Sequence, residues 1–566
     1  MSTVSRTTAT PAAPPTRSWP VLLVVVCAQM LIWLDTSILN VAVTTLADPV
    51  EGLGATPGEL EWVASAYTLV VAGTLFAGGA LADRFGPRNT LVAGLALIGV
   101  ASGAGAFVDS PEWLIVARVF MGTGAGLLMP ATLTVIVQST PEEKRTRAIA
   151  IWSSSSGLGV AIGPVAGGAL LSHFWWGSVF LVNVPIVALC LPAVLAVVPD
   201  LGGSRRRVLD LPGLLLSVLG LGGVVYGIIE LGGGSAWYGP HVLLPLVLGA
   251  VVLAVFVAGQ RRSATPSLDL RLFRQPGFTA GSVVLLIAFM ALAGHLFYAA
   301  FYLQGPRGLS PADAGTVMIA AAIGIVLGSQ ASPALSRRLS ARWTVAAGVL
   351  ATAATYVAYA WLDGETPLWV VVALLWIQGF GMGVVGTPVT AVMMRGVPPQ
   401  LAGAGSAVNS VTRQVGGTLG VAMAGSILSA VYRDRMAEAE LPGPAQGLSP
   451  AAGEQARASA EAARALADSL NLPDLATAAD RAFLDAMYAA TLSVAALALI
   501  GCAVAVTGLR NRTTPEHRKP EREREPEPEP EPEREREREP ESTPQIRTRP
   551  QKPTQVSDPA RRGTAR

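Results

Sequence analysis

The chain of 566 residues is 51% hydrophobic and only 14% charged, and its formal net charge is +2. A soluble protein of this length would carry about a quarter charged residues, and the charges here stand in clusters between long neutral runs. This composition excludes a soluble globular protein and predicts an all-α integral membrane protein with many spans.

Several kinds of chemistry lack the residues that they need. The cysteines Cys27, Cys190 and Cys502 lie inside apolar runs, so they indicate neither a disulfide framework nor a metal site. No lysine ends a G-x-x-x-x-G-K phosphate loop, which argues against transport driven by ATP hydrolysis in this chain. No basic patch contains interleaved aromatic residues, so we expect no nucleic-acid partner. We also expect no enzymatic activity, no catalytic residue and no cofactor.

Residues 1–18 are rich in Ser, Thr, Pro and Ala and are predicted to form a disordered cytoplasmic arm. The apolar run that follows is too long for a signal-peptide core and has no clear cleavage site. From there the apolar runs predict fourteen transmembrane helices, each near the length of about 20 residues that crosses a bilayer. The predicted spans are residues 19–44, 60–82, 89–108, 113–136, 147–171, 178–198, 211–230, 240–259, 278–302, 311–335, 343–362, 368–394, 403–430 and 483–508.

The loops between these spans alternate in charge. Every second loop is rich in arginine, as at Arg84 and Arg88, at 205–207 and at Arg337. The short loops between them are acidic or neutral, with Arg307 as the exception. The positive-inside rule therefore places both termini in the cytoplasm. Two cytoplasmic termini require an even number of spans, and fourteen satisfies this requirement.

The predicted span at 147–171 contains an unusual stretch, Gly157–Gly168, with the sequence GLGVAIGPVAGG. Gly159, Gly163 and Gly167 recur every fourth residue and share one helix face, which lets a neighbouring backbone approach closely. Pro164 removes a backbone donor and is expected to bend the helix. This spacing fits an ordinary packing face or a hinge seam, and we interpret it as a close-packed seam between two moving halves.

Two later segments do not have the composition of a membrane span. Residues 431–481 mix Arg, Glu, Ala and Pro and are predicted to form an extracytoplasmic loop, with an Ala-rich helix at Gly453–Leu470. Residues 509–566 include EREREPEPEPEPEREREREPE at 521–541, and alternating charge with proline cannot form a core. This tail is predicted to be disordered and cytoplasmic.

A weak internal repeat relates two parts of the chain. The glycines at Gly122–Gly126 recur at Gly379–Gly383, 257 positions later, and Gly163 matches Gly420 at the same offset. The repeat predicts two six-helix bundles with two extra spans inserted between them, and transporters built from repeats bind their substrate at the repeat interface. The predicted domains are the arm 1–18, an N-terminal bundle 19–198, a linker with two spans 199–277, a C-terminal bundle 278–508 that includes the loop 431–481, and the tail 509–566.

Four motifs match known signatures. GALADRFGPRNTL at Gly79–Leu91 fits the loop signature G-x-L-A-D-R-x-G-x-R-x-x-L, and Arg118 with the glycines at 122–126 fits R-x-x-x-G-x-G-x-G. Gly159–Gly168 fits an antiporter motif, and Leu34–Ala42 is similar to a first-span motif. On these motifs the chain resembles the major facilitator superfamily, specifically its fourteen-span drug:proton antiporter group, over residues 19–508.

The resemblance implies the major facilitator fold and roles for two sets of residues. The antiporter motif marks exporters within the superfamily, and its residues here are Gly159, Gly163, Pro164, Gly167 and Gly168. The cytoplasmic loop would be a charge latch that holds the halves together in the outward-facing state, and its residues here are Gly79, Asp83, Arg84, Gly86 and Arg88. Asp83 would meet a helix N-terminus or an arginine of the other half. The alternative is a solvated charge cluster that only sets topology.

Ionisable groups inside the membrane are costly and are therefore candidates for function. Removal from water disfavours the charged form of a carboxylate, so we expect Asp35 to load and release a proton or to pair with a cationic substrate. The resemblance implies that Arg118 takes part in proton coupling, and Glu230 and Arg413 complete the predicted coupling or substrate residues. A purely structural role is the alternative for each of these four, and for the lone His295 simple hydrogen bonding is the expectation.

These residues together predict proton-coupled efflux of hydrophobic organic compounds, such as antibiotics or drugs, across the cytoplasmic membrane. The protein would work as a monomer in the lipid bilayer, with the proton gradient as its energy source. An uptake permease or symporter on the same fold is one alternative, and the antiporter motif argues against it. A non-transporting sensor or scaffold is the other, and the charges inside the membrane argue against that.

Overall fold

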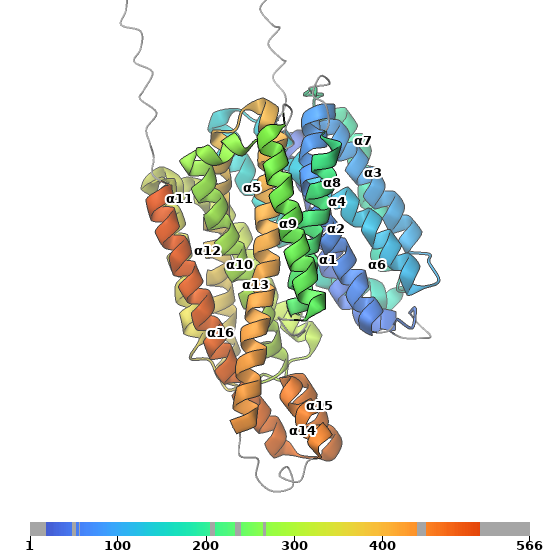
Figure 1. Ribbon diagram of the computed structural model, residues 1–566, viewed down its shortest axis with the longest axis vertical. Helices are drawn as coiled ribbons and strands as arrows, with labels where there is room; N and C mark the ends of the chain where they lie inside the picture. Colours follow the sequence, from blue (N-terminus) through green and yellow to red (C-terminus); the bar gives the residue numbers. More distant parts are fainter. Residues whose placement is uncertain are drawn as a thin grey trace, which may run out of the picture. The chain divides into compact units, whose positions relative to one another are not determined.

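The computed structural model describes residues 18–47, 52–55, 57–203, 210–232, 239–263, 268–438 and 449–509. In this part of the chain the regular structure is entirely helical (Figure 1). Almost all of the predicted arm at 1–18 and tail at 509–566 lies outside the described residues, and so do the three arginines at 205–207.

The helices of the predicted N-terminal bundle and linker begin and end close to the predicted spans. In the bundle they are α1 (Ser18–Ala47), α2 (Pro57–Phe85), α3 (Pro87–Gly105), α4 (Pro111–Ser139), α5 (Glu142–His173), the short α6 (Ser178–Leu181) and α7 (Asn183–Val197). The linker contains α8 (Leu211–Gly232), α9 (Pro240–Arg262) and the 3₁₀ turn η1 (Leu270–Arg274).

The predicted C-terminal bundle has longer helices. They are α10 (Pro276–Gln304), α11 (Pro311–Tyr359), α12 (Leu368–Arg395), the 3₁₀ turn η2 (Pro399–Leu401), α13 (Ala402–Glu438), α14 (Pro450–Ala458), α15 (Ala460–Leu470) and α16 (Pro473–Gly508). Proline at the first turn of α10, α11 and α16 suits a helix start, because its missing N–H has no helical partner there.

Twelve of the described helical segments are long and apolar enough to cross a membrane. One of them contains a kink at Ser340, where φ is 69°, so α11 consists of two helices as the separate spans 311–335 and 343–362 predict. Helix α3, of 19 residues, is outside the twelve and corresponds to the predicted span 89–108. With α11 divided and α3 added, the helices correspond to the fourteen predicted spans.

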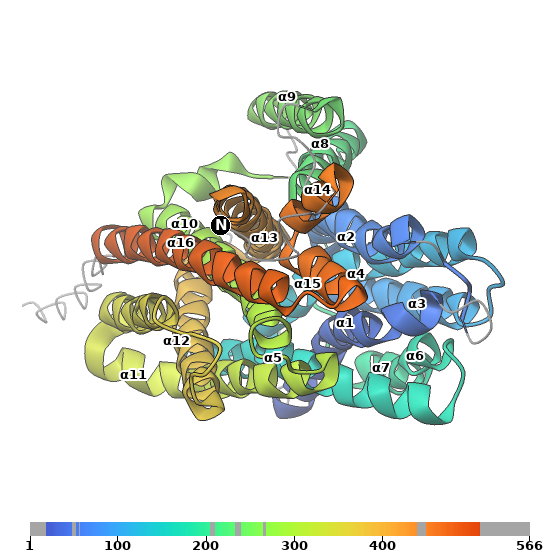
Figure 2. The same cartoon turned by 90° about the horizontal axis from the view of Figure 1, so that it is seen from below.

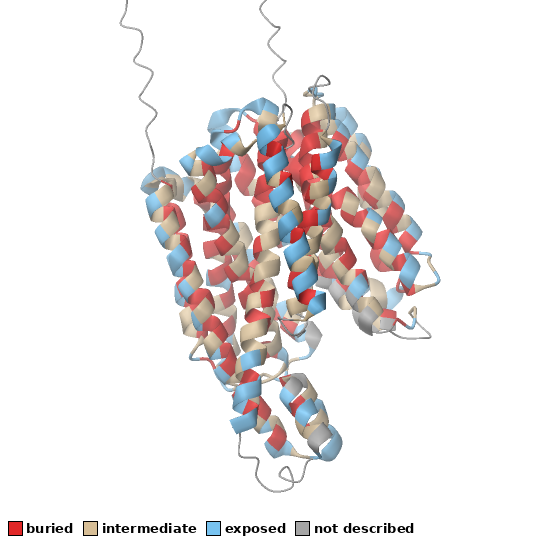
Figure 3. Cartoon of the chain, in the orientation of Figure 1, coloured by how far each residue is buried: buried red, intermediate tan, exposed pale blue. Residues whose placement is uncertain are grey.

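The two inserted helices form a hairpin beside the rest of the bundle (Figure 2). Helix α9 is exposed over most of its surface (Figure 3), which suits a helix with lipid on most sides. Helix α8 contacts both α2 and α13. Its Leu221 and Val225 pack on Ala72 of α2, and Val411 and Val415 of α13 lie against the same cluster. The hairpin therefore rests on both predicted bundles.

The chain between α13 and α16 contains two helices, where one was predicted at Gly453–Leu470. The break is at Ser459, whose extended backbone ends α14 and whose hydroxyl accepts a hydrogen bond from the Ala462 N–H as the N-cap of α15. Arg464 of α15 lies 2.6 Å from Asp480 of α16. This ion pair ties the loop to the end of the bundle where α16 begins (Figure 1).

The glycine face of α5 packs against α1 of the same predicted bundle. A Cβ atom at Gly159 would lie 2.7 Å from the Cβ of Trp33, and one at Gly163 would overlap the Cβ of Ser37. Gly167 faces α1 as well, at Val41. The expectation that this face forms the seam between two halves is therefore wrong, because the glycines serve close packing of α1 on α5.

Gly157 and Gly168 of α5 are not part of this contact with α1. Gly157 stands outside the every-fourth pattern, and it is the glycine that approaches α11 of the other predicted bundle, 2.8 Å from the Ala322 carbonyl for an added Cβ. Gly168 has no neighbour within 4 Å of an added Cβ. The side chain of Pro164 is outside the described part of the structure.

The contrast between two glycines of α5 gives a test of this packing. Gly163→Ala should lower the melting temperature by several degrees, because a methyl group forced into a filled contact costs about 1–3 kcal/mol. Gly168→Ala makes the same chemical change at an open position and should leave the melting temperature unchanged or raise it slightly. Thermal unfolding of the purified proteins in detergent measures both, and equal melting temperatures for the two variants would contradict the packing described here.

Candidate functional site

Helix α1 carries a carboxylate into the interior of the N-terminal bundle. Asp35 is only 3% exposed, and its neighbours Leu34 and Ile38 are buried apolar side chains. An ionised carboxylate removed from water in this way requires hydrogen bonds and an opposite charge.

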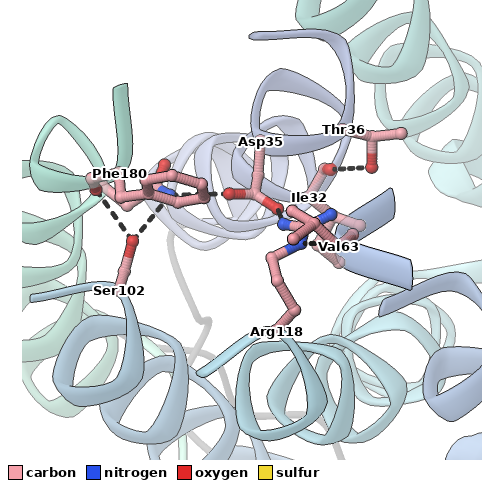
Figure 4. A network of polar contacts seen from close by, with 8 residues as sticks. Ile32, Asp35, Thr36, Val63, Ser102, Arg118 and Phe180 are labelled. Carbon is pink, nitrogen blue, oxygen red and sulfur yellow. Dashed lines mark hydrogen bonds and ion pairs between the residues drawn. The ribbon is translucent and has the colours of Figure 1, made fainter. Parts of the chain in front are cut away.

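Arg118 of α4 supplies the opposite charge. Its Nη1 lies 2.6 Å from Asp35 Oδ2, and its Nε donates a hydrogen bond of 3.0 Å to the Val63 carbonyl of α2. Its guanidinium carbon stands 4.2 Å from the ring centre of Tyr67, which adds a cation–π contact. Because Arg118 is only 1% exposed, the two charges meet out of contact with water (Figure 4).

A second set of polar groups holds the other carboxylate oxygen. Asn183, the first residue of α7, donates hydrogen bonds to Asp35 Oδ1 at 2.9 Å and to the Ser102 hydroxyl at 3.0 Å. Ser102 in turn donates to the Phe180 carbonyl at 2.8 Å. The carboxylate is therefore fixed from α4 on one side and from α7 on the other (Figure 4).

In this geometry both carboxylate oxygens of Asp35 have partners from the same bundle. In this state a cationic substrate does not have access to the carboxylate, since Arg118 occupies that place. The pair instead links α1 to α4 through two opposite charges.

A second polar cluster consists of Arg413 and Asn409 of α13 and Thr390 of α12, and Arg413 is its charged residue. Its Nε donates to Asn409 Oδ1 at 3.0 Å, and its Nη2 donates to Thr390 Oγ1 at 2.8 Å. The ring centres of Trp152 in α5 and Phe289 in α10 lie 5.2 and 5.0 Å from its guanidinium carbon. No carboxylate among the residues that the structure describes forms an ion pair with Arg413.

A cavity between the two predicted bundles adjoins Arg413. Side chains from α1, α4 and α5 line one side of it, and side chains from α13 line the other. Trp152 is fixed in the lining because its indole N–H donates to the Thr132 hydroxyl at 3.1 Å, and Gln29 lies 3.0 Å from the same hydroxyl. Transporters built from repeats bind their substrate at the interface between the repeats, so this cavity lies where a substrate site is expected.

The other predicted intramembrane residues lie apart from this cavity. Glu230, close to the end of α8, is half-buried and is not part of the lining. His295 of α10 is fully buried, with Nδ1 2.9 Å from the Tyr298 hydroxyl and the rings of Tyr356 and Tyr359 against it. The expectation that His295 is hydrogen-bonded is confirmed.

Asp83, at the end of α2, meets the N-terminus of α13. Its two oxygens accept hydrogen bonds from the backbone N–H groups of Gly403, at 2.7 Å, and Ala404, at 3.1 Å. These N–H groups lack helical partners and carry the positive end of the helix dipole. Gly79 permits the approach, since a Cβ there would lie 2.6 Å from the Gly403 carbonyl. The predicted contact with a helix N-terminus of the other half is present.

The remaining loop residues make other contacts. Arg88 donates a hydrogen bond to the Leu195 carbonyl at the end of α7, where a cation complements the helix dipole. Gly86 has a φ of 91°, which glycine adopts at little cost. The guanidinium of Arg84 lies 5.1 Å from the ring of Phe85. Asp83 and Gly79 are loop residues that contact α13.

Two further hydrogen bonds join the bundles close to Asp83. The Thr134 hydroxyl donates to the Ser406 hydroxyl at 3.1 Å, and Gln138 Nε2 donates to the Pro399 carbonyl at 2.8 Å. Contacts of α2 and α4 with the start of α13 therefore close one end of the protein. The loop charges predict that this end is cytoplasmic.

A family model described as the Major Facilitator Superfamily matches residues 25–421. The chain is 33% identical over 521 residues to the multidrug efflux pump LfrA of Mycolicibacterium smegmatis, which covers 90% of this chain and 100% of LfrA. It is also 33% identical over 416 residues to the methyl viologen resistance protein SmvA of Salmonella typhimurium, which covers 73% of this chain and 83% of SmvA.

Solved structures support the same fold. The crystal structure of the human organic anion transporter MFSD10 (TETRAN) aligns with a TM-score of 0.58, covering 87% of this chain and 100% of that one. The sequence identity of that alignment is 14%, so the likeness concerns the fold alone.

The ion pair of α1 and α4 gives a test by double substitution. Arg118→Gln leaves Asp35 buried without its partner, which costs about 3–5 kcal/mol in comparable buried pairs, so the melting temperature should fall strongly. Adding Asp35→Asn to the same protein removes the second charge and should restore most of the loss. Thermal unfolding in detergent measures all variants, and a single Arg118→Gln variant as stable as the wild type would show that the pair does not compensate Asp35.

Proposed function

We propose that this chain, which belongs to the Major Facilitator Superfamily, exports hydrophobic organic compounds such as drugs or antibiotics in exchange for protons. The observation that carries the proposal is the buried ion pair of Asp35 and Arg118 inside a multi-pass membrane protein. Its relatives include proteins named for multidrug efflux and for methyl viologen resistance, which supports export of small molecules.

Proton binding at Asp35 would provide the coupling. The neutral acid no longer attracts Arg118, so protonation from the outside weakens the link between α1 and α4 and favours substrate release and return of the empty protein. Loss of the proton to the cytoplasm restores the pair and favours substrate loading. A ligand and a proton can drive such a change only through their different affinities for the two states.

The cytoplasmic contacts would set the direction in which the cavity opens. Asp83 and Gly79 hold α2 against the start of α13, so the described state is closed at the predicted cytoplasmic end. In the transport cycle these contacts must part for a substrate to enter from the cytoplasm. We assign the protein to the bacterial cytoplasmic membrane with both termini in the cytoplasm, and we expect it to work as a monomer without a cofactor.

Inverted membrane vesicles with an imposed pH gradient, acidic inside, test proton-coupled export. The probes are three fluorescent dyes, neutral coumarin 153, cationic rhodamine 123 and anionic fluorescein. We expect the wild-type protein to accumulate at least one dye and to stop when nigericin collapses the gradient. Asp35→Asn should reduce gradient-driven accumulation by about tenfold or more, since it removes the only proton site in the proposed mechanism.

Asp109→Asn, in the exposed loop between α3 and α4, is the matched control and should transport like the wild type. Each variant is compared at equal amounts of protein in the membrane. Accumulation that persists after the gradient collapses would reject proton coupling, and undiminished accumulation by Asp35→Asn would reject Asp35 as the proton site.

The cytoplasmic latch is tested by Asp83→Asn. The amide has one acceptor oxygen and no charge, so it cannot reproduce both hydrogen bonds to Gly403 and Ala404 or the interaction with the helix dipole. We expect normal insertion and a reduction of transport by about tenfold, measured in the same vesicles. Transport at the wild-type rate by a well-expressed Asp83→Asn protein would remove the latch from the mechanism.

A further inference from the structure

The central cavity has an unusual balance of charge. Its lining contains one formally charged residue, Arg413, and neither an aspartate nor a glutamate. Asp35, the nearby acid predicted from the sequence, is not part of the lining and is held by Arg118 and Asn183. A ligand in this cavity therefore meets a guanidinium without meeting a carboxylate.

The guanidinium is only partly compensated. Its two hydrogen bonds go to the neutral oxygens of Asn409 and Thr390, and arginine carries five N–H donors in all. The faces of Trp152 and Phe289 hold its plane in position through cation–π contacts. A partly buried cation gains most from an anionic oxygen, because charge-assisted hydrogen bonds are about twice as strong as neutral ones.

Two further donors in the same lining lack a partner. The indole N–H of Trp33 and the hydroxyl of Ser153 are buried, and neither has a hydrogen-bond partner among the described residues. Ser153 is 8% exposed. A buried donor without an acceptor is costly, so Trp33 favours a ligand that brings an acceptor atom. The Ser153 hydroxyl can donate or accept and can therefore bind such an atom as well. The indole nitrogen of Trp33 can donate a hydrogen bond but cannot accept one, so only an acceptor atom of a ligand can satisfy it.

We propose that Arg413 selects the substrate, and that the cavity binds aromatic compounds with an anionic oxygen, such as a carboxylate, phenolate or enolate, in preference to cations. The cavity has a volume of about 40 Å³ in the described state, which is too small for an aromatic compound, so such a ligand enters only when the bundles part. Its anionic oxygen would then lie against Arg413, with Trp33 and Ser153 donating to its neighbouring acceptors. The indole rings of Trp33 and Trp152 would pack on the aromatic part of the ligand. This assignment of substrate class rests on the export function proposed above and deepens it.

The test compares two dyes with the same xanthene framework. Fluorescein is an anion at pH 8, and rhodamine 123 is a cation. Binding of each dye to the purified full-length protein is measured by fluorescence anisotropy. We expect wild-type protein to bind fluorescein more tightly than rhodamine 123, and Arg413→Gln to weaken fluorescein binding by about tenfold or more, the effect of losing a charged hydrogen bond, while rhodamine 123 binding stays the same or improves.

Three other variants make the assignment specific. Arg413→Lys keeps the charge and should retain part of the preference for fluorescein. Trp33→Phe should weaken fluorescein binding by about two- to tenfold, the usual range for one neutral hydrogen bond. Arg395→Gln removes an exposed positive charge from the end of α12 and should leave both affinities unchanged.

A purely structural Arg413 would lower the melting temperature in the Arg413→Gln variant without changing the preference between the dyes, and that result overturns the proposal. Equal or tighter binding of rhodamine 123 by the wild type, or no binding of fluorescein at all, also overturns it. The vesicle assay separates this inference from the export proposal. Arg413-dependent fluorescein binding without gradient-driven accumulation refutes export alone, whereas gradient-driven transport of rhodamine 123 but not fluorescein refutes the substrate class alone.

Discussion

The pair of Asp35 and Arg118 constrains the whole N-terminal bundle. Two charges taken out of water are tolerated only when every lone pair and donor finds a partner, and those partners come from α2, α3, α6 and α7 as well as α1 and α4. Close packing of α1 on the glycine face of α5 belongs to the same requirement, because it holds the helix that carries Asp35 in place.

The two bundles surround Arg118 and Arg413 differently. Arg118 has a full counter-charge, whereas Arg413 has neutral oxygens and aromatic faces. The first arrangement is an ion pair within one bundle, and the second leaves a cation at the cavity between both. In the mechanism proposed here, energy input and substrate recognition are therefore placed on different residues, and a change in one arginine need not alter the role of the other.

Much of this could be predicted from the sequence, because membrane spans and charges inside them leave strong patterns. The helices, the buried Asp35 and Arg118, and the contact of Asp83 with a helix N-terminus follow from apolar length, the cost of a buried charge and a loop motif. The partner of the α5 glycines could not, because a small-residue face does not specify which helix packs on it. Asn183, Trp33 and Ser153 were missed as well, since one polar or indole side chain in an apolar run has no spacing that distinguishes a site from ordinary packing.

The position of α8 has a mechanical consequence. This helix packs on Ala72 of α2 and on Val411 and Val415 of α13, at one continuous apolar cluster. If the two bundles tilt against each other during a cycle, α8 cannot remain fixed to both, and one of its two surfaces must slide. The apolar contacts of the inserted hairpin at this cluster would then affect how far and how easily the bundles can turn.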